Sequence, residues 1–123
     1  MSERGFITSD KYLVEVSTLN HIETIAYPDE DGNYELKAME SIYLPYGEIR
    51  KVHTGTMFYT QNDDERLVVY TPDNLLENGI QVIYKMYDQF SEIEIWLHNT
   101  SKSYYQIKQF DTVAYANFVK ILK

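Results

Sequence analysis

Residues 78–99 read NGIQVIYKMYDQFSEIEIWLHN, and this stretch decides the fold class. Its second half alternates: Ile93, Ile95 and Leu97 fall on one face of an extended chain, and the positions between them fall on the other. Trp96 is the exception on the polar face, so we expect another layer or another subunit to cover it. The whole stretch predicts a strand, a turn and a second strand.

Similar runs fill the rest of the chain, and we expect strands over residues 11–17, 21–27, 34–38, 41–45, 48–60, 66–71, 80–87, 92–99, 103–108 and 112–122. A β-bulge is expected near Gly55. Residues 72–79 predict one helical turn, capped by Asp73 or Asn74 and ending at Asn78 and Gly79. Residues 98–103 predict a polar hairpin loop. Because no 3.6-residue period is sustained, we expect one all-β domain over residues 1–123, a barrel or a sandwich.

The composition fits a folded protein of a reducing compartment. A chain of 123 residues with 44% hydrophobic and 15% aromatic residues suits one core and argues against disorder. The absence of cysteine excludes disulfides, thiolate metal sites and a cysteine nucleophile. The net charge of -8 argues against nucleic acid as a partner. Because no apolar run reaches the ~20 residues that span a bilayer and no secretory pattern opens the chain, we expect a cytoplasmic protein without membrane contact.

Motifs for metals and catalysis are weak. Residues 29–40 offer carboxylates at the spacing of a calcium loop, but the glycine is Gly32, where the sharp turn would need one at the position of Tyr34. A charged surface loop is the better interpretation. The histidines are dispersed, which favours structural or surface roles, although a Ser-His-Asp set stays open. They are His21, His53 and His98. We expect no metal and no cofactor.

The order of segments from residue 33 to residue 119 resembles the dUTPase and dCTP-deaminase superfamily. GNYELKAMESIYLPYGEIRKVHTGTMF (32–58) follows that family's A-G-x-D-L, L-P-x-G-E and T-G pattern. RLVVYTPDNLLENGIQV (66–82) stands where the family has a strand, P-R-S-G-L-A and K-N-G-I. YDQFSEIEIWLHN (87–99) stands at I-D-x-D-Y-R-G-E-I, and YQIKQFDTVAYANFV (105–119) at I-x-x-G-D-R-I-A-Q. The resemblance implies a jelly-roll β-barrel, usually trimeric, whose enzymes cleave dUTP with magnesium or deaminate dCTP.

Carried over position by position, the resemblance keeps few of the family's functional residues. Glu35 stands for the aspartate of the first motif, and P-R-S-G falls on residues 70–73, where Asp73 would repel a triphosphate. The catalytic aspartate's place falls on Met86, with Asp88 nearby. The sugar-packing tyrosine and the arginine of that motif fall on Gln89 and Phe90. In the fourth motif Asp111 persists, and the glutamine is replaced by Tyr115.

We therefore expect a catalytically inactive, dUTPase-like pseudoenzyme, viral or from a phage, that forms a homotrimer and acts by protein–protein binding in a regulatory or host-directed role. We expect no catalytic residue. The expected interaction surface is the family's cleft between subunits: Tyr70, Asp73, Tyr84, Tyr87, Asp88 and Phe90. Glu35 and Asp111 are the acidic positions that match the family.

Three alternatives stay open. The first is a divergent magnesium-dependent dUTP pyrophosphatase, in which Glu35, Asp88 and Asp111 hold the ion. Three cations would then have to point into the cleft: Arg50, Arg66 and Lys85. The second is a virion decoration or assembly protein. The third is a β-sandwich monomer whose strand pattern converged on that of the family.

Overall fold

The computed structural model describes residues 11–16, 23–85 and 87–121. Several expectations fall outside these ranges. They are the strand ends expected at residues 17, 21 and 122, the assignment of the catalytic position to Met86, and the absence of a secretory pattern at the amino terminus.

Within the described ranges the chain is almost entirely β, as expected, with one short helix. The elements are β1 (Lys11–Val16), β2 (Glu23–Ala26), β3 (Tyr34–Lys37), β4 (Ile42–Leu44), β5 (Ile49–His53), β6 (Thr56–Thr60), β7 (Glu65–Tyr70), α1 (Asp73–Glu77), β8 (Ile80–Val82), β9 (Glu94–Asn99), β10 (Tyr105–Ile107) and β11 (Thr112–Lys120). None of the described helical residues forms a segment long and apolar enough to cross a membrane.

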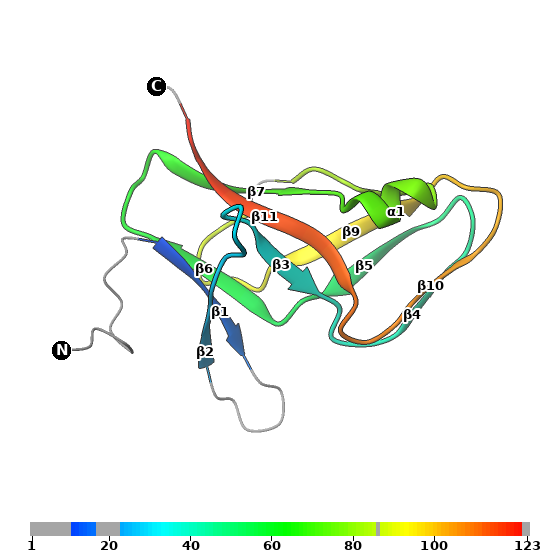
Figure 1. Cartoon of the computed structure of the whole chain (residues 1–123), viewed down its shortest axis with the longest axis horizontal. Helices are drawn as coiled ribbons and strands as arrows, with labels where there is room; N and C mark the ends of the chain where they lie inside the picture. The colour runs from blue at the N-terminus through cyan, green and yellow to red at the C-terminus, as the bar shows by residue number, and fades with distance from the viewer. Residues whose placement is uncertain (1–10, 17–22, 86, 122–123) are drawn as a thin grey trace.

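The strands form four small antiparallel sheets, in the orders β2-β1-β6, β10-β4, β3-β11-β7 and β5-β9-β8 (Figure 1). Figure 1 shows β11 running beside β7 and β3, with β4, β10 and α1 at the opposite end from the two termini. The inward faces of these sheets share one apolar core, which includes Leu13, Leu36, Leu67, Ile80 and Val113.

β9 confirms the alternation in the sequence. Ile93, Ile95 and Leu97 are fully buried, whereas Trp96 is only half-buried. The Lys51 ammonium lies over the Trp96 ring, 5.9 Å from its centroid. The cover that the chain itself gives Trp96 is therefore a side chain of the neighbouring strand, and the indole keeps an exposed edge.

The expectation of a β-bulge near Gly55 is wrong. Residues 48–60 form two strands, β5 and β6, which pair in different sheets. Gly55 has a φ of 63°, a conformation that glycine adopts without steric cost. The Thr54 hydroxyl donates a hydrogen bond of 2.6 Å to the carbonyl of Ile93 and fixes this corner. The glycine marks a change of sheet, which the spacing of apolar residues could not distinguish from a bulge.

Two other local expectations are corrected. The N-cap of α1 is Pro72, with no side-chain cap bond, so neither Asp73 nor Asn74 caps the helix, although it ends at Asn78 as expected. Residues 98–103 do not close a hairpin, because β10 pairs with β4 and not with β9. The turn instead carries the chain from the sheet of β9 to the sheet of β10. The buried side-chain amide of Asn99 holds this turn by hydrogen bonds to Ser101 and Ser103.

Candidate functional site

Strand pairing brings three of the family-matched positions into one row. Tyr115 of β11 lies opposite Glu35 of β3 on one side and opposite Tyr70 of β7 on the other. The Tyr70 and Tyr115 rings are 5.8 Å apart. We call this group the tyrosine row. It unites segments that stand at the first, second and fourth motifs of the resemblance.

Both family-matched acids of this region are held in place. The Glu35 carboxylate accepts a hydrogen bond of 2.8 Å from the Thr112 hydroxyl. The Asp111 carboxylate accepts one of 2.9 Å from the amide N–H of Lys108. Asp111 and Tyr115 line a pocket of about 320 Å³, to which α1 contributes Asn74. The described residues that line this pocket carry one carboxylate, that of Asp111, and no basic side chain.

The electrostatic surroundings of the row are acidic. Burial raises the pKa of the Tyr70 phenol, and the nearby charges of Asp29 and Asp31 raise it further. The phenol is protonated at neutral pH and can donate a hydrogen bond. Such a surface suits a cation, a metal-bound group or the polar atoms of a protein better than a bare triphosphate.

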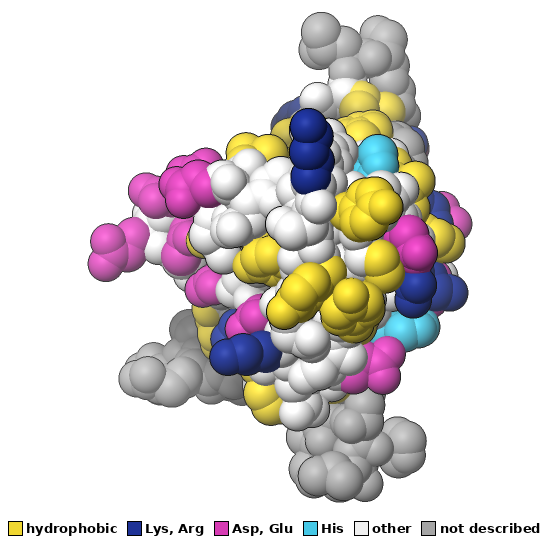
Figure 2. Space-filling model, turned by 90° about the vertical axis from the view of Figure 1, so that its right-hand side faces the viewer, with side chains coloured by type: hydrophobic (Ala, Val, Ile, Leu, Met, Phe, Trp, Pro, Cys, Tyr) yellow, Lys and Arg dark blue, Asp and Glu magenta, His cyan; other side chains and the backbone are white. Residues whose placement is uncertain are grey.

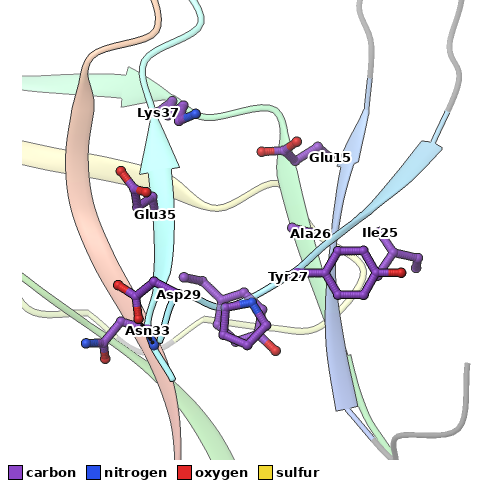
Figure 3. Close-up of a pocket in the computed structure, with 10 residues that line it drawn as sticks. Glu15, Ile25, Ala26, Tyr27, Asp29, Asn33, Glu35 and Lys37 are labelled. Atoms are coloured by element: carbon purple, nitrogen blue, oxygen red, sulfur yellow. Dashed lines mark hydrogen bonds between the residues drawn. The ribbon is translucent and has the colours of Figure 1, made fainter. Parts of the chain in front are cut away.

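A larger pocket, of about 400 Å³, lies between β3 and the β1–β2 pair (Figure 3). Figure 3 shows Glu15 and Lys37 facing each other across it, with Glu35 on the side of β11. The loop at its end is closed by Asp29, whose carboxylate accepts hydrogen bonds of 2.9 Å from the amides of Asp31 and Asn33. Because this loop joins two strands, the structure supports a charged surface loop over a helix-flanked calcium loop.

The segment that stands at the third motif begins outside any strand, because β8 ends at Val82 and not at residue 87. Residues 83–85 and 87–93 connect β8 to β9, and we call them the 83–93 loop. Phe90 is 64% exposed and has a φ of 66°. Its amide donates to the carbonyl of Phe58 at 3.1 Å, and its ring lies 5.3 Å from that of Tyr59. Tyr84 is also exposed. This loop presents aromatic side chains to the outside.

Tyr87 does not belong to that exposed surface. Its side chain is 8% exposed, and its hydroxyl donates to the Glu94 carbonyl at 3.3 Å. Burial raises the pKa of Tyr87 to about 12. Tyr87 also lines a pocket of about 360 Å³, together with the exposed Asp88 and with Arg66. This pocket is separate from the one beside the tyrosine row, so in a single chain the expected surface divides into two regions.

The magnesium set of the pyrophosphatase alternative does not form within one chain. In the described ranges, the one group of three acidic or histidine side chains with ligand atoms close together is His53, Glu92 and Glu94. Of the cations of that alternative, only Arg50 is paired away from the cleft residues, whereas Arg66 lines the pocket of Asp88 and Lys85 contacts Tyr87. Arg50 pairs with Glu48, Arg66 donates to backbone carbonyls, and Lys85 lies over the Tyr87 ring. Sequence reasoning missed His53 because its partners lie on another strand.

A second exposed aromatic surface lies at the end of the molecule where β4 and β10 meet. Hydrophobic side chains gather near the centre of the face shown in Figure 2. Tyr43, Tyr46 and Tyr104 are all exposed in these strands and their adjoining turns, and the rings of Tyr43 and Tyr104 stack at 5.1 Å. The sequence did not reveal this surface, because Tyr104 is far from Tyr43 and Tyr46 in the chain.

The fold is that of the dUTPases. No protein-family model matches the sequence, and no curated protein matches it either. The solved dUTPase of EIAV matches with a TM-score of 0.72 and 14% identity, covering 89% of this chain and 88% of that one. A dUTPase of phage phi11 of S. aureus matches with a TM-score of 0.77 and 12% identity, covering 94% and 93%. A dUTPase variant of Staphylococcus bacteriophage 80alpha, bound to dUpNHpp, matches with a TM-score of 0.76 and 11% identity, covering 94% and 88%. The expected dUTPase-like fold is confirmed.

These similarities also correct one expectation. We expected that the chain is not an enzyme, but solved proteins that share its fold over most of its length are dUTPases, which are enzymes. The expectation rested on replaced motif residues. The tyrosine row carries oxygen-bearing side chains at three of the family's motif positions, so replacement of motif residues has not removed every functional group there.

Proposed function

We propose that this chain is a regulatory protein of viral or phage origin that uses the dUTPase fold to bind a protein partner. It works as a homotrimer in the cytoplasm, that of the host cell if it is viral. The fold relatives support the regulatory role. The phage 80alpha dUTPase is described as belonging to phage dUTPases that control transfer of virulence genes by a G protein-like mechanism.

The proposal rests on Phe90, whose side chain is exposed on a backbone with positive φ. A bulky residue with positive φ is rare and costs about 1–3 kcal/mol, so the surrounding structure must hold it there. The amide bond to the Phe58 carbonyl and the ring contact with Tyr59 do so. The ring remains 64% exposed on a backbone that is already fixed. A large aromatic side chain that needs little ordering is suited to anchor a protein interface.

The trimer would complete this surface. Tyr70 and Phe90 lie in separate regions of one chain, and the resemblance places the working cleft between subunits. Packing of a second copy is therefore proposed to bring the tyrosine row and the 83–93 loop together. Light scattering should give a mass of about 43 kDa, three times the 14.5 kDa chain. A monomer at micromolar concentration would contradict the trimer.

The binding proposal is tested with a matched pair of variants. Phe90→Ser should weaken binding to a host protein that co-purifies with the wild type by about 30-fold, the effect of losing a hot spot of about 2 kcal/mol. Phe110→Ser is the control, because Phe110 is also exposed and has a φ of 73°. Equal affinity of the wild type and Phe90→Ser, or equal losses in both variants, would refute the role of Phe90. Co-sedimentation with assembled particles and no soluble partner would favour the decoration or assembly role.

A second candidate is a divergent magnesium-dependent dUTP pyrophosphatase. It is favoured by the shared fold with dUTPases, one of them bound to dUpNHpp. It is also favoured by the position of Glu35 in the tyrosine row, opposite Tyr115. The test is pyrophosphate release from each deoxynucleoside triphosphate in the presence of magnesium. Turnover lost in Glu35→Gln or Asp88→Ala, and kept in the exposed helix variant Glu77→Gln, would establish it. No release from any nucleotide would remove this candidate.

A further inference from the structure

The outer face of the β5–β9 pair carries a compact group of nitrogen and oxygen ligands that neither proposed function uses. His53 of β5 lies directly opposite Glu94 of β9 in the strand register. Glu92 precedes Glu94 by two residues and projects from the same face. Directly opposed side chains on neighbouring strands have Cβ atoms about 4.5–5.5 Å apart. The sheet therefore positions all three side chains before any ligand binds.

The distances within this group fit one metal ion. His53 Nδ1 lies 3.0 Å from Glu92 Oε1 and 3.4 Å from Glu94 Oε2, and all three ligand atoms lie within 4.8 Å of one another. Tetrahedral bonds of about 2.0–2.2 Å place neighbouring ligands about 3.3–3.6 Å apart. The separation of 3.4 Å already lies in that range, and a shift of a few tenths of an ångström at an exposed side-chain end would bring the separation of 3.0 Å into it.

A contact from outside the group orients one of these carboxylates. The amide N–H of Gly55, at the corner between β5 and β6, donates to Glu92 Oε2 at 2.9 Å. This bond occupies one oxygen and directs the other, Oε1, toward His53. Metal-binding carboxylates are held by outer hydrogen bonds in the same way.

A surface ion-pair network is the simpler explanation. Lys51 Nζ lies 3.4 Å from Glu94 Oε2, the oxygen that also faces His53. Lys51 and both glutamates are about a third exposed or more, and such pairs contribute only about 0–1 kcal/mol. So weak a contact leaves the Lys51 ammonium able to move into solvent. Ion pairing alone also does not require three ligand atoms to converge on one point.

We propose that His53, Glu92 and Glu94 bind one divalent transition-metal ion, Zn²⁺ in preference to Mn²⁺, with a fourth position left for water. One imidazole and two carboxylates form a donor set that suits zinc, and nitrogen and oxygen ligands bind Zn²⁺ more tightly than Mn²⁺. The site is distinct from the tyrosine row and from Phe90. It stands whether or not the proposed functions are correct.

The single tryptophan offers a direct test. Trp96 is two residues from Glu94 on the same face, so Co²⁺ bound at the site should quench its fluorescence, and Zn²⁺ should compete with Co²⁺. We expect one saturable site in the full chain. His53→Gln and Glu94→Gln should each weaken binding at least tenfold, since loss of an outer-shell partner alone costs about 10–100-fold. His98→Gln is the control, because His98 lies on the same face but about 13 Å along the strand from Glu94.

Equal Co²⁺ affinity in the wild type and His53→Gln, or an equal loss in His98→Gln, would overturn the proposal. A second measurement needs no variant that could misfold. In imidazole nitrogen spectra of the wild type, Zn²⁺ should shift Nδ1 of His53 and leave His98 unchanged. No shift at His53 with saturating Zn²⁺ would also overturn the proposal.

Discussion

The ion pair between Lys11 and Glu65 gives the sharpest test of how this fold is stabilised. The Glu65 side chain is 3% exposed, and Lys11 Nζ lies 2.6 Å from its Oε2. Its other oxygen accepts hydrogen bonds from Asn62 Nδ2 at 2.6 Å and from the Thr60 hydroxyl at 3.2 Å. Lys11→Met keeps most of the aliphatic stem and removes the ammonium, which also lies over the Phe118 ring at 5.9 Å from its centroid. The variant therefore tests the charge and not the packing.

The magnitude follows from the exposure of the two partners. Removing one partner of a fully buried pair costs about 3–5 kcal/mol, because the other charge is left uncompensated. Lys11 is 35% exposed, and Thr60 and Asn62 still donate to the carboxylate, so the cost should be smaller. We expect a loss of about 2 kcal/mol in the free energy of unfolding at pH 7. For a chain of this size, that loss lowers Tm by about 6–10 °C.

The pH dependence separates this explanation from lost packing. The hydrogen bond from Lys11 is the largest cause that lowers the pKa of Glu65 below 4.5, while burial opposes it. A lowered folded pKa contributes stability above the unfolded value of 4.5, and this contribution is lost as pH falls through the folded pKa. Lys11→Met removes the main cause, so the two proteins should differ less at pH 3 than at pH 7.

Urea unfolding at both pH values measures these differences, with Lys102→Met as the control at an exposed lysine. The double variant Lys11→Met, Glu65→Gln should recover part of the loss, because it leaves no buried charge. A loss below about 0.5 kcal/mol at pH 7, within the range of ordinary surface substitutions, would refute the reasoning. A loss of equal size at pH 3 and pH 7 would refute it as well.

Three further predictions test other parts of the structure. Asn99→Ala should lower the free energy of unfolding by about 3 kcal/mol in urea, because the buried amide bonds two carbonyls and accepts from the amide and hydroxyl of Ser101. In alkaline titration Tyr87 should ionise near pH 12. Because its folded pKa exceeds the unfolded value of 10.0, the free energy of unfolding should fall by about 2–3 kcal/mol between pH 10 and pH 12, and Tyr87→Phe should remove this loss. Gly79→Ala should lower Tm more than Gly32→Ala. Both glycines have positive φ, which costs an alanine about 1–2 kcal/mol. Only at Gly79 would the new Cβ also lie too close to a neighbour, 2.9 Å from Cβ of Ser101.

The sequence predicted the features that depend on local pattern or on segment order. Alternation in β9 identified its buried face, because side chains in a strand project with a period of two. The order of motifs placed Glu35, Tyr70 and Tyr115 in segments that the resemblance associates with one site, and the pairing of β3, β11 and β7 brings them together.

What the sequence did not predict depends on which strands become neighbours. Gly55 turns the chain from one sheet to another, and a local pattern cannot show that β5 and β6 have different partners. His53 meets Glu94 only through the β5–β9 pairing. Tyr87 lies in a loop whose residues are mostly exposed, and its burial follows from a tertiary contact with β9.

The position of β11 has a consequence for synthesis of the chain. β3 and β7 each pair with β11 and not with each other, so the middle strand of their sheet follows both of them in the sequence. While the ribosome makes the intervening residues, the edges of β3 and β7 that will contact β11 have no partner from that strand. Such edges attract other chains. Nascent chains stalled before residue 112 should therefore be the species most prone to aggregate and to bind chaperones.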